Sequence, residues 1–256
     1  MTIKNLIFLL LYLYTTTYSF DSPINKNETY GPGEKIVFEV KYGIFHGGYG
    51  MMEVQDTIRY RGRICHQIRV IATSNKGLSL VYPVRDTNIS IIDAEGLYSH
   101  RIVKHINEGN YIRYRTTDFT PDVGMARTVD HTVFRDSTFS TENYIHDIIS
   151  AFFYFRTIKV RDSIDITCID DFKKYPLRVK VIKKETIKTD LGKFSCIVIE
   201  PQITSSGIFL KKGKMNIWLT DDDRRLPVLV KFKMPFLGSI SCNLVEYNPA
   251  KIVKLP

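Results

Sequence analysis

The sequence is dominated by short segments in which apolar and polar residues alternate. After Gly33, apolar side chains at Ile36, Phe38, Val40 and Tyr42 share one parity, and the charged Lys35, Glu39 and Lys41 share the other. Successive side chains of a β-strand point to opposite faces of a sheet, so a period of two predicts a strand with one buried face. Similar runs recur along the chain, separated by turn residues such as RGR at 61–63. The pattern predicts a mainly β protein.

The alternating runs predict a meander of antiparallel strands. The 15 Tyr and 15 Phe of the chain support this prediction, because aromatic side chains fit a pleated surface well. The predicted strands occupy residues 36–42, 52–60, 64–72, 78–84, 87–92, 97–106, 111–117, 163–169, 177–186, 194–200, 214–220, 226–234 and 239–247.

One segment has helical periodicity. In ENYIHDIISAFFYFR, residues 142–156, apolar side chains recur every three or four positions, behind Ser140 or Thr141 as the cap. We expect one helix here, packed against the inner face of the sheet, because its apolar stripe needs a partner.

The two halves of the chain resemble each other. TIRYRGRICHQIRV near Thr57 is similar to TIKTDLGKFSCIVI near Thr186, and NISIIDAEGLYSHRIV near Asn88 is similar to NIWLTDDDRRLPVLV near Asn216. The fold class that we predict is therefore one large curved antiparallel sheet or open β-barrel with two similar halves and one packed helix. A flexible segment at 20–32 precedes one domain at 33–250, with halves at about 33–125 and 158–250, and a tail follows at 251–256.

The N-terminus has the features of an export signal. Lys4 precedes an apolar run at 6–14, and small polar residues end at Ser19. This order predicts a signal peptide at 1–19, because the run is too short to span a bilayer. The processed protein is then expected to be periplasmic or secreted, without a transmembrane span.

The chain is basic, with 36 Lys and Arg against 27 Asp and Glu, a formal charge of +9. The excess is spread along the predicted strands, so a solvated lysine face is one interpretation and contact with anionic lipid or acidic glycan is another. We expect no nucleic-acid partner, because no binding motif is present.

Cysteines and acidic residues give no metal motif. Cys65, Cys168, Cys196 and Cys242 stand singly, which favours buried thiols, although an exported chain allows three disulfide pairings. The three aspartates of DDDRR, residues 221–225, lie between two alternating runs, so we interpret them as a hairpin turn. We expect no catalytic motif, no metal and no cofactor, since neither a GxSxG elbow nor an HExxH sequence occurs.

An ordered set of segments resembles a known bacterial family. These segments are GPGEKIVFEVKYGIFHGGYGMMEV, DIISAFFYFRTI, YPLRVKVIKKETIKTDLGKFSCIVIEP and MNIWLTDDDRRLPVLVKFKMPFLGSISCNL. Together they resemble the exported family named Domain of Unknown Function 3108, most specifically at Gly33-Glu34 and from Ile217 to Pro227. The resemblance implies an envelope protein rich in β structure and carries over no catalytic residue.

The leading functional hypothesis is a non-catalytic envelope protein that holds an apolar molecule such as a lipid. A curved sheet of this size can enclose an apolar cavity. The candidate lining residues are Tyr42, Phe45, Phe152, Phe153 and Trp218. The alternatives are a structural or scaffold protein that binds another envelope protein, and a hydrolase of glycan or peptide. These aromatic residues equally suit a filled core.

Overall fold

The structure is a computed structural model that describes residues 22–159, 162–203, 214–234 and 238–251. The predicted signal peptide at 1–19 lies outside these residues. The N-terminal strands are β1 (Lys35–Tyr42), β2 (Phe45–Val54), β3 (Ile58–Tyr60), β4 (Arg63–Ser74), β5 (Arg85–Asp93), β6 (Ser99–Glu108), β7 (Tyr111–Thr120), β8 (Met125–Asp130) and β9 (Arg135–Ser140). The later strands are β10 (His146–Asp147), β11 (Ser163–Asp170), β12 (Lys173–Thr189), β13 (Gly192–Ile203), β14 (Lys214–Thr220), β15 (Pro227–Met234) and β16 (Gly238–Asn248). The helices are α2 (Lys76–Ser79) and α3 (Ile148–Thr157).

All of these strands belong to one 16-stranded sheet. The strands follow chain order from β10 to β16, then β16 pairs with β1, and the order continues through β2 and β4 to β9, with β3 paired to β4. The β1–β16 pair is antiparallel and places Phe38 opposite Leu244. This pairing joins the beginning and the end of the described chain into a single sheet.

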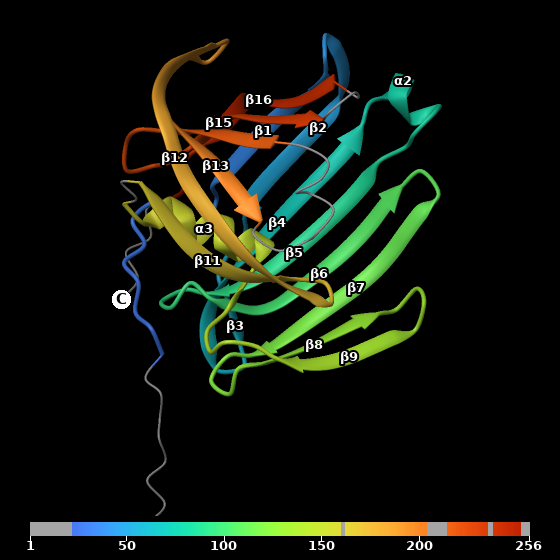
Figure 1. The fold of residues 1–256 in the computed structure, drawn as a ribbon, viewed down its shortest axis with the longest axis vertical. Coiled ribbons are helices and arrows are strands. Elements are labelled where there is room, and N and C mark those ends of the chain that lie inside the picture. The colour runs from blue at the N-terminus through green and yellow to red at the C-terminus, as the bar shows by residue number, and fades with distance from the viewer. Residues whose placement is uncertain (1–21, 160–161, 204–213, 235–237, 252–256) are drawn as a thin grey trace, which may run out of the picture.

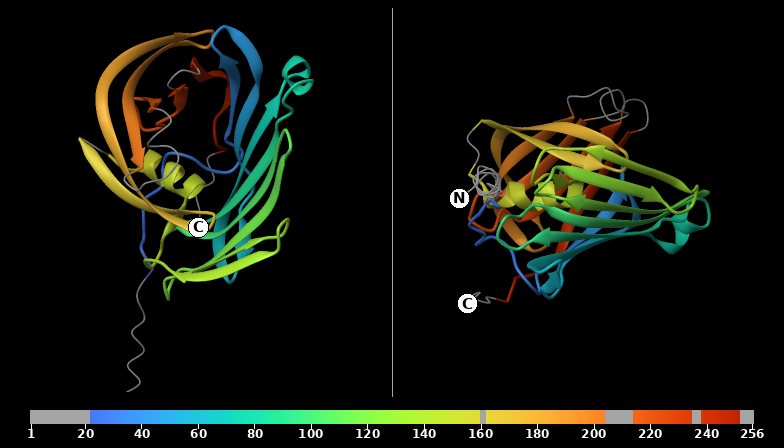
Figure 2. Two further views of the ribbon diagram at one scale, coloured as in Figure 1. Left: turned by 45° about the vertical axis from the view of Figure 1, so that its right-hand side comes forward. Right: turned by 90° about the horizontal axis from the view of Figure 1, so that it is seen from below.

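The sheet curls around α3, as Figure 1 and the left view of Figure 2 show. Ala151 and Phe155 of α3 pack with β11 to β14, while Phe153 packs with Val54 and Ile68 on the other side of the helix. The helix therefore fills part of the space that the curved sheet surrounds. The prediction of a mainly β protein with one large open sheet and a packed helix is confirmed. The predicted duplication and domain boundaries stay predictions.

The helix begins later than its sequence pattern indicates. Residues 142–147 form turns and the short β10, and α3 begins at Ile148. Asp147, rather than Ser140 or Thr141, caps it: the carboxylate accepts hydrogen bonds from the backbone N–H groups of Ile149 and Ser150 at 2.7 and 3.0 Å. Neither helix in the described part of the chain has the length and hydropathy of a membrane span.

Between residues 75 and 140 one predicted strand is absent and two strands were not predicted. Residues 78–84 form the end of α2 and a turn instead of a strand, because Asn75 accepts a hydrogen bond from Leu78 N–H and caps a helical turn. Strands β8 and β9 were missed. On β8 the buried positions are Ala126, Thr128 and Asp130, so its inward face lacks the run of large apolar residues that marks a strand.

Side chains bridge the space between the two ends of the sheet. Lys104 of β6 forms ion pairs with Asp170 and Asp171, and Arg115 of β7 also bonds to Asp171. Thr128 of β8 donates to the backbone carbonyl of Asp171 at 2.8 Å. The β11–β12 turn is thus held against β6, β7 and β8 by polar contacts, although the sheet order ends at β10 and β9.

Candidate functional site

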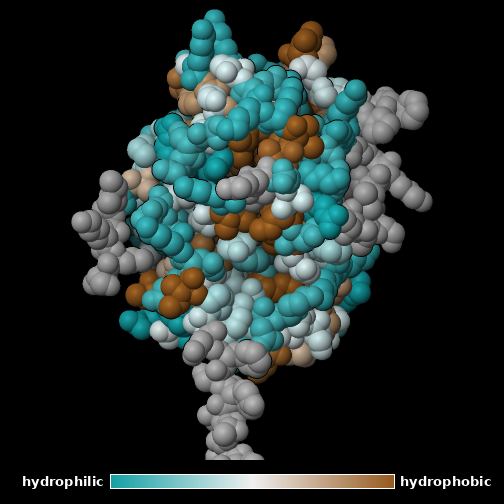
Figure 3. Space-filling view, turned by 60° about the vertical axis from the view of Figure 1, so that its left-hand side comes forward, coloured by the Kyte–Doolittle hydropathy of each residue, from teal (hydrophilic) through white to brown (hydrophobic). Residues whose placement is uncertain are grey.

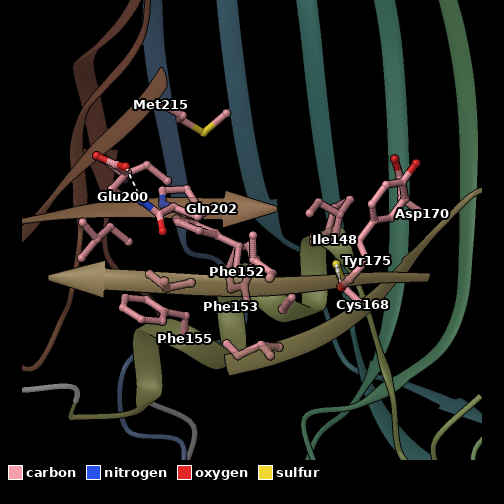
Figure 4. A pocket seen from close by; sticks show the side chains of 18 of the residues that line it. Ile148, Phe152, Phe153, Phe155, Cys168, Asp170, Tyr175, Glu200, Gln202 and Met215 are labelled. Carbon is pink, nitrogen blue, oxygen red and sulfur yellow. Dashed lines mark hydrogen bonds between the residues drawn. The ribbon is translucent and has the colours of Figure 1, made fainter. Parts of the chain in front are cut away.

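A cavity of about 850 Å³ lies between α3 and the concave face of the sheet. We name it the main cavity. Its walls come from α3, from β11 to β15 and, on the opposite side, from β2 and β4. Figure 4 shows side chains from α3 and the surrounding strands converging on it. In Figure 3, apolar side chains are visible in recesses between hydrophilic ones on the face shown.

The lining is apolar because two periodicities meet there. Phe152, Phe153 and Phe155 of α3 all line the cavity, as do Ile199 of β13 and Ile217 of β14. Side chains at every second position of a strand share one face, so β11 to β15 present a continuous apolar surface to the helix. Such a lining favours ligands with apolar surface, because transfer of that surface from water is favourable.

Polar residues are confined to the borders of the main cavity. Asp170 and Tyr175 lie on one side of the view in Figure 4, and Glu200 and Gln202 on the other. Gln202 Nε2 donates to Glu200 at 2.6 Å, and Lys214 Nζ lies 2.6 Å from the other oxygen of that carboxylate. Burial acts to raise the pKa of Glu200, but Lys214 and Gln202 outweigh it and hold the pKa below its ordinary value.

Cys168 provides a thiol in the main cavity. Burial raises its pKa to about 12, and the carboxylates of Asp170 and Asp147 act in the same direction. The Sγ atom lies 3.7 Å from the carbonyl oxygen of Tyr175. A thiol with this pKa is protonated at neutral pH and is a weak nucleophile. All four cysteines are free, and Cys65, Cys168 and Cys196 are buried.

Two of the five predicted lining residues lie at the main cavity. Phe152 and Phe153 line it, as their positions on the helix led us to expect. Phe45 and Tyr42 instead stand at the β1–β2 turn with 70% and 48% of their surface exposed. Trp218 packs in a separate core cluster and donates from Nε1 to Glu185 at 3.0 Å.

The position of Trp218 away from the main cavity has a simple geometric cause. Its neighbour Ile217 lines the main cavity, so the next side chain along β14 points to the other face of the sheet. Alternation shows that two residues face opposite ways but does not show which face encloses a cavity. The cavity residues on β11 to β13 were missed because their apolar runs look like any half-buried strand.

A second cavity, of about 410 Å³, adjoins the first. We name it the side cavity. Asp170 and Tyr175 line both, and the remaining walls come from β7 to β9 and the β11–β12 turn. Its lining contains four cations and three carboxylates, namely Arg113, Arg115, Arg135, Lys173, Asp130, Asp170 and Asp171. The sequence could not predict this site, because its residues come from segments up to 62 positions apart that meet only where β11–β12 touches β7 to β9.

Cys65, Asp93 and His100 bring three potential metal ligands within 4.8 Å of one another. Their spacing in the sequence gives no motif, and three neighbouring strands bring them together. The Asp93 carboxylate already accepts hydrogen bonds from Arg63 at 2.7 and 2.8 Å and lies 3.1 Å from His100 Nε2. Burial raises the pKa of Cys65 to about 12. These contacts suit a polar network that ties β4 to β5 and β6.

The aspartate-rich turn at 221–225 is the hairpin between β14 and β15 that the sequence predicted. Asp222 accepts hydrogen bonds from Thr220 and from the Arg224 guanidinium, at 2.6 and 2.5 Å. Asp221 bonds to Lys184 at 2.6 Å. The carboxylates therefore stabilise the turn through neighbouring donors.

Known structures resemble this fold at low sequence identity. A beta-barrel-like protein of domain of unknown function DUF1849 from Brucella abortus is 10% identical, with a TM-score of 0.58, over 87% of this chain and all of that one. A hypothetical protein from Chlamydia trachomatis is 8% identical, with a TM-score of 0.40, over 89% of this chain and 92% of that one. The Brucella structure shows that the architecture occurs elsewhere. No curated protein matches the sequence.

The sequence itself matches one family model, which is described as protein of unknown function (DUF3108). The match extends over residues 37–245. It includes every strand from β2 to β15, the helix α3 and all residues that line the main cavity. The chain therefore belongs to the DUF3108 family.

Proposed function

We propose that this protein is an exported, non-catalytic envelope protein that holds an apolar molecule, such as a lipid, in the main cavity. The observation that carries the proposal is the size and lining of that cavity, about 850 Å³ with walls made largely of aliphatic and aromatic side chains. Ligand cavities in proteins commonly have volumes of roughly 300–1,000 Å³. The predicted signal peptide supports export.

The polar groups of the main cavity favour binding over chemistry. Each of its two carboxylates forms an ion pair: Asp170 with Lys104, and Glu200 with Lys214. They lie toward different borders of the cavity in Figure 4, so they do not form the pair that general acid and base catalysis uses. The Cys168 thiol, with a pKa of about 12, is not activated. These features support a site that holds a ligand without transforming it.

A series of saturated fatty acids of increasing length tests the proposal. Each methylene group moved from water into an apolar site contributes about 0.8 kcal/mol, so affinity should rise about fourfold per methylene until the cavity is filled. Displacement of a fluorescent fatty acid from the protein lacking residues 1–19 would measure this. Mass spectrometry of lipid extracted from the purified protein would show what it carries.

Variants locate the binding in the main cavity. Val179 is 3% exposed and lines it, so Val179→Phe should fill part of the space and lower affinity for the longest chains by about tenfold or more. Val123→Phe is the matched control, because Val123 is 61% exposed in the β7–β8 turn and does not line the cavity. Circular dichroism of both variants checks the fold. The absence of extracted lipid together with no saturable binding would contradict the proposal and favour a scaffold role.

A further inference from the structure

Four turns of the sheet lie along one edge. In an antiparallel meander, alternate turns fall at the same end of the strands. Residues 41–45, 75–85, 108–113 and 130–135 contain the turns that connect β1 to β2, β4 to β5, β6 to β7 and β8 to β9, together with the strand residues next to them. We name them the rim turns. Figure 1 shows them along the upper and right edge of the molecule, and the right view of Figure 2 shows most of them together at one side.

The rim turns are in contact with one another. Asn75 N–H donates to Gly47 O at 2.8 Å, just below the first turn. Gly109 N–H donates to Pro83 O at 2.7 Å and links the second turn to the third. A bridge between Val84 and Glu108 joins the same two turns. An ion pair between Arg113 and Asp130, at 3.6 Å, links the third turn to the fourth. The rim turns therefore form one connected edge rather than four independent loops.

Large apolar side chains are exposed on every rim turn. Those more than half exposed are Ile44 87%, Phe45 70%, Leu80 89%, Val81 85%, Ile112 54%, Val133 51% and Phe134 91%. Single exposed apolar residues are normal on protein surfaces, but a row along one edge marks an interaction site. Phe134 also has a φ of 54°, a region that bulky residues rarely adopt. Its backbone therefore carries a cost while its ring gains no burial.

The opposite ends of the same strands have a different surface. The turns there are 54–58, 60–63, 93–99 and 120–125, and we name them the far turns. In these four turns Val123 alone is a large apolar residue with high exposure. Leu97 and Tyr98 are buried, at 0% and 3%. The exposed apolar row is thus a property of one edge and not of turns in this sheet generally.

Charge differs between the edges in the same sense. The rim turns contain five cations, Lys41, Lys76, Arg85, Arg113 and Arg135, and two carboxylates, Glu108 and Asp130. The far turns contain two cations, Arg61 and Arg63, and four carboxylates, Asp56, Asp93, Glu95 and Asp122. Among the described residues, Lys76, Arg85 and Arg135 form no ion pair with a carboxylate. Exposed apolar side chains can insert among lipid headgroups, and cations beside them are attracted to anionic lipid, so this combination favours binding to an anionic bilayer. We call the exposed apolar side chains of the rim turns the apolar tips.

We propose that the rim turns dock this protein on an anionic lipid surface, with the apolar tips inserted among the headgroups. A lipid surface fits better than a second copy of the chain, because two rims meeting face to face would bring like charges together. Val133 of the fourth rim turn also lines the side cavity, which shares Asp170 and Tyr175 with the main cavity. Docking would therefore bring the side cavity near the lipid, but the proposal does not require that a lipid be carried.

Vesicle sedimentation tests the docking. The protein lacking residues 1–19 should sediment with vesicles of phosphatidylcholine and phosphatidylglycerol and should bind vesicles of phosphatidylcholine alone more weakly. Combining Ile44→Ser, Leu80→Ser and Phe134→Ser should lower the partition coefficient at least about tenfold, because each tip loses its apolar contact. Lys76→Glu with Arg85→Glu should remove the preference for phosphatidylglycerol. Val123→Ser, a matched change in a far turn, should leave binding unchanged.

A fluorescence measurement reports the insertion directly. A tryptophan introduced by Phe134→Trp should be quenched by brominated lipid, whereas one introduced by Val123→Trp should not, and buried Trp218 contributes equally to both. Equal sedimentation of the wild type and the triple serine variant would overturn the proposal, and so would equal quenching of the two tryptophans. Self-association of the wild type that the serine changes abolish, without vesicle binding, would assign the edge to a second copy instead.

Discussion

Arg156 and Glu34 form an ion pair that is withdrawn from water, with side-chain exposures of 0% and 1%. Nη1 and Nη2 of Arg156 donate to the two carboxylate oxygens of Glu34 at 2.8 Å each. Nη2 also donates to the backbone carbonyl of Arg224 at 3.1 Å. This pair fastens the C-terminal end of α3 to the residue that precedes β1. Its sequence positions, 122 residues apart, give no indication of the contact.

Removal of one partner should be costly. Arg156→Met should lower the free energy of unfolding by about 3–5 kcal/mol, because Glu34 would be left buried without a counter-charge. Urea denaturation measures this. Adding Glu34→Gln to Arg156→Met should restore part of the loss. Arg178→Met is the control, since Arg178 and Asp165 are exposed and an exposed ion pair contributes little to stability. Equal losses for Arg156→Met and Arg178→Met would contradict the argument.

His66 makes stability depend on pH. Burial lowers the pKa of His66 from the ordinary 6.5 to about 4, although Asp93 acts in the opposite direction. Between these values the unfolded chain binds a proton that the folded chain does not. The contribution to stability is therefore complete above pH 6.5 and is lost as the pH falls toward 4.

The loss at pH 4 should be about 2–3 kcal/mol relative to a variant without the imidazole. Urea denaturation of the wild type and of His66→Leu between pH 4 and pH 7 would measure it, because the difference between the two curves removes the other titrating groups. The wild-type curve should fall more steeply on acidification. Parallel curves would show that His66 is not held neutral.

At the scale of elements, the β11–β12 turn makes polar contacts with β6, β7 and β8. These contacts hold the two parts of the open sheet against each other around α3. Burial acts to lower the pKa of Lys104, but Asp170 and Asp171 outweigh it and raise the pKa, so the lysine stays charged. Arg115 reaches the same turn. The edge strand β10 has only two residues and pairs with β11 alone, so few backbone bonds fix it.

Replacing Lys104 and Arg115 by methionine should loosen this edge. Amide hydrogen exchange in β10 and β11 should become faster by about tenfold or more, because their opening no longer has to break the ion pairs. Exchange in β15 and β16 should not change. Arg127→Met, which removes an exposed pair with Asp136, is the control. Faster exchange in β15 and β16 to the same extent would indicate general destabilisation instead of a local contact.

At the scale of the whole molecule, the β1–β16 pair joins the strands β1 to β9 and the strands β10 to β16 into one sheet. Leu244 is 2% exposed and belongs to a core cluster that also contains Ile36, Phe38 and Trp218. This cluster draws its residues from β1 and from β13 to β16, together with Leu226 of the β14–β15 turn, so it spans the junction. Strands from the two ends of the chain therefore share one hydrophobic core.

Leu244→Ala should reduce the free energy of unfolding by about 2–5 kcal/mol, through lost burial and the space left behind. Because the core is shared, Trp218 fluorescence and far-ultraviolet circular dichroism should report a single transition that shifts together in the variant. Leu191→Ala is the control, since Leu191 is 46% exposed. Two separate transitions would show that the halves unfold independently.

The sequence by itself determined the class of this protein. Alternation predicted most strands, because a strand shows its two faces in consecutive residues, and helical spacing predicted α3. It did not predict where α3 begins, since Ile145 continues the apolar spacing while Asp147 provides the cap. It missed β8 because threonine and aspartate occupy its buried face.

The tertiary structure alone decided the site. Phe152 and Phe153 line the main cavity because they lie on the helix that the sheet surrounds. Trp218 does not line it, and the sequence could not show this, because a period of two separates the faces of a strand but does not tell which face closes around a cavity. The side cavity, the Arg156–Glu34 pair and the row of rim turns depend on contacts between distant segments. Such contacts follow from the curvature and strand order of the sheet, and local patterns carry no information about either.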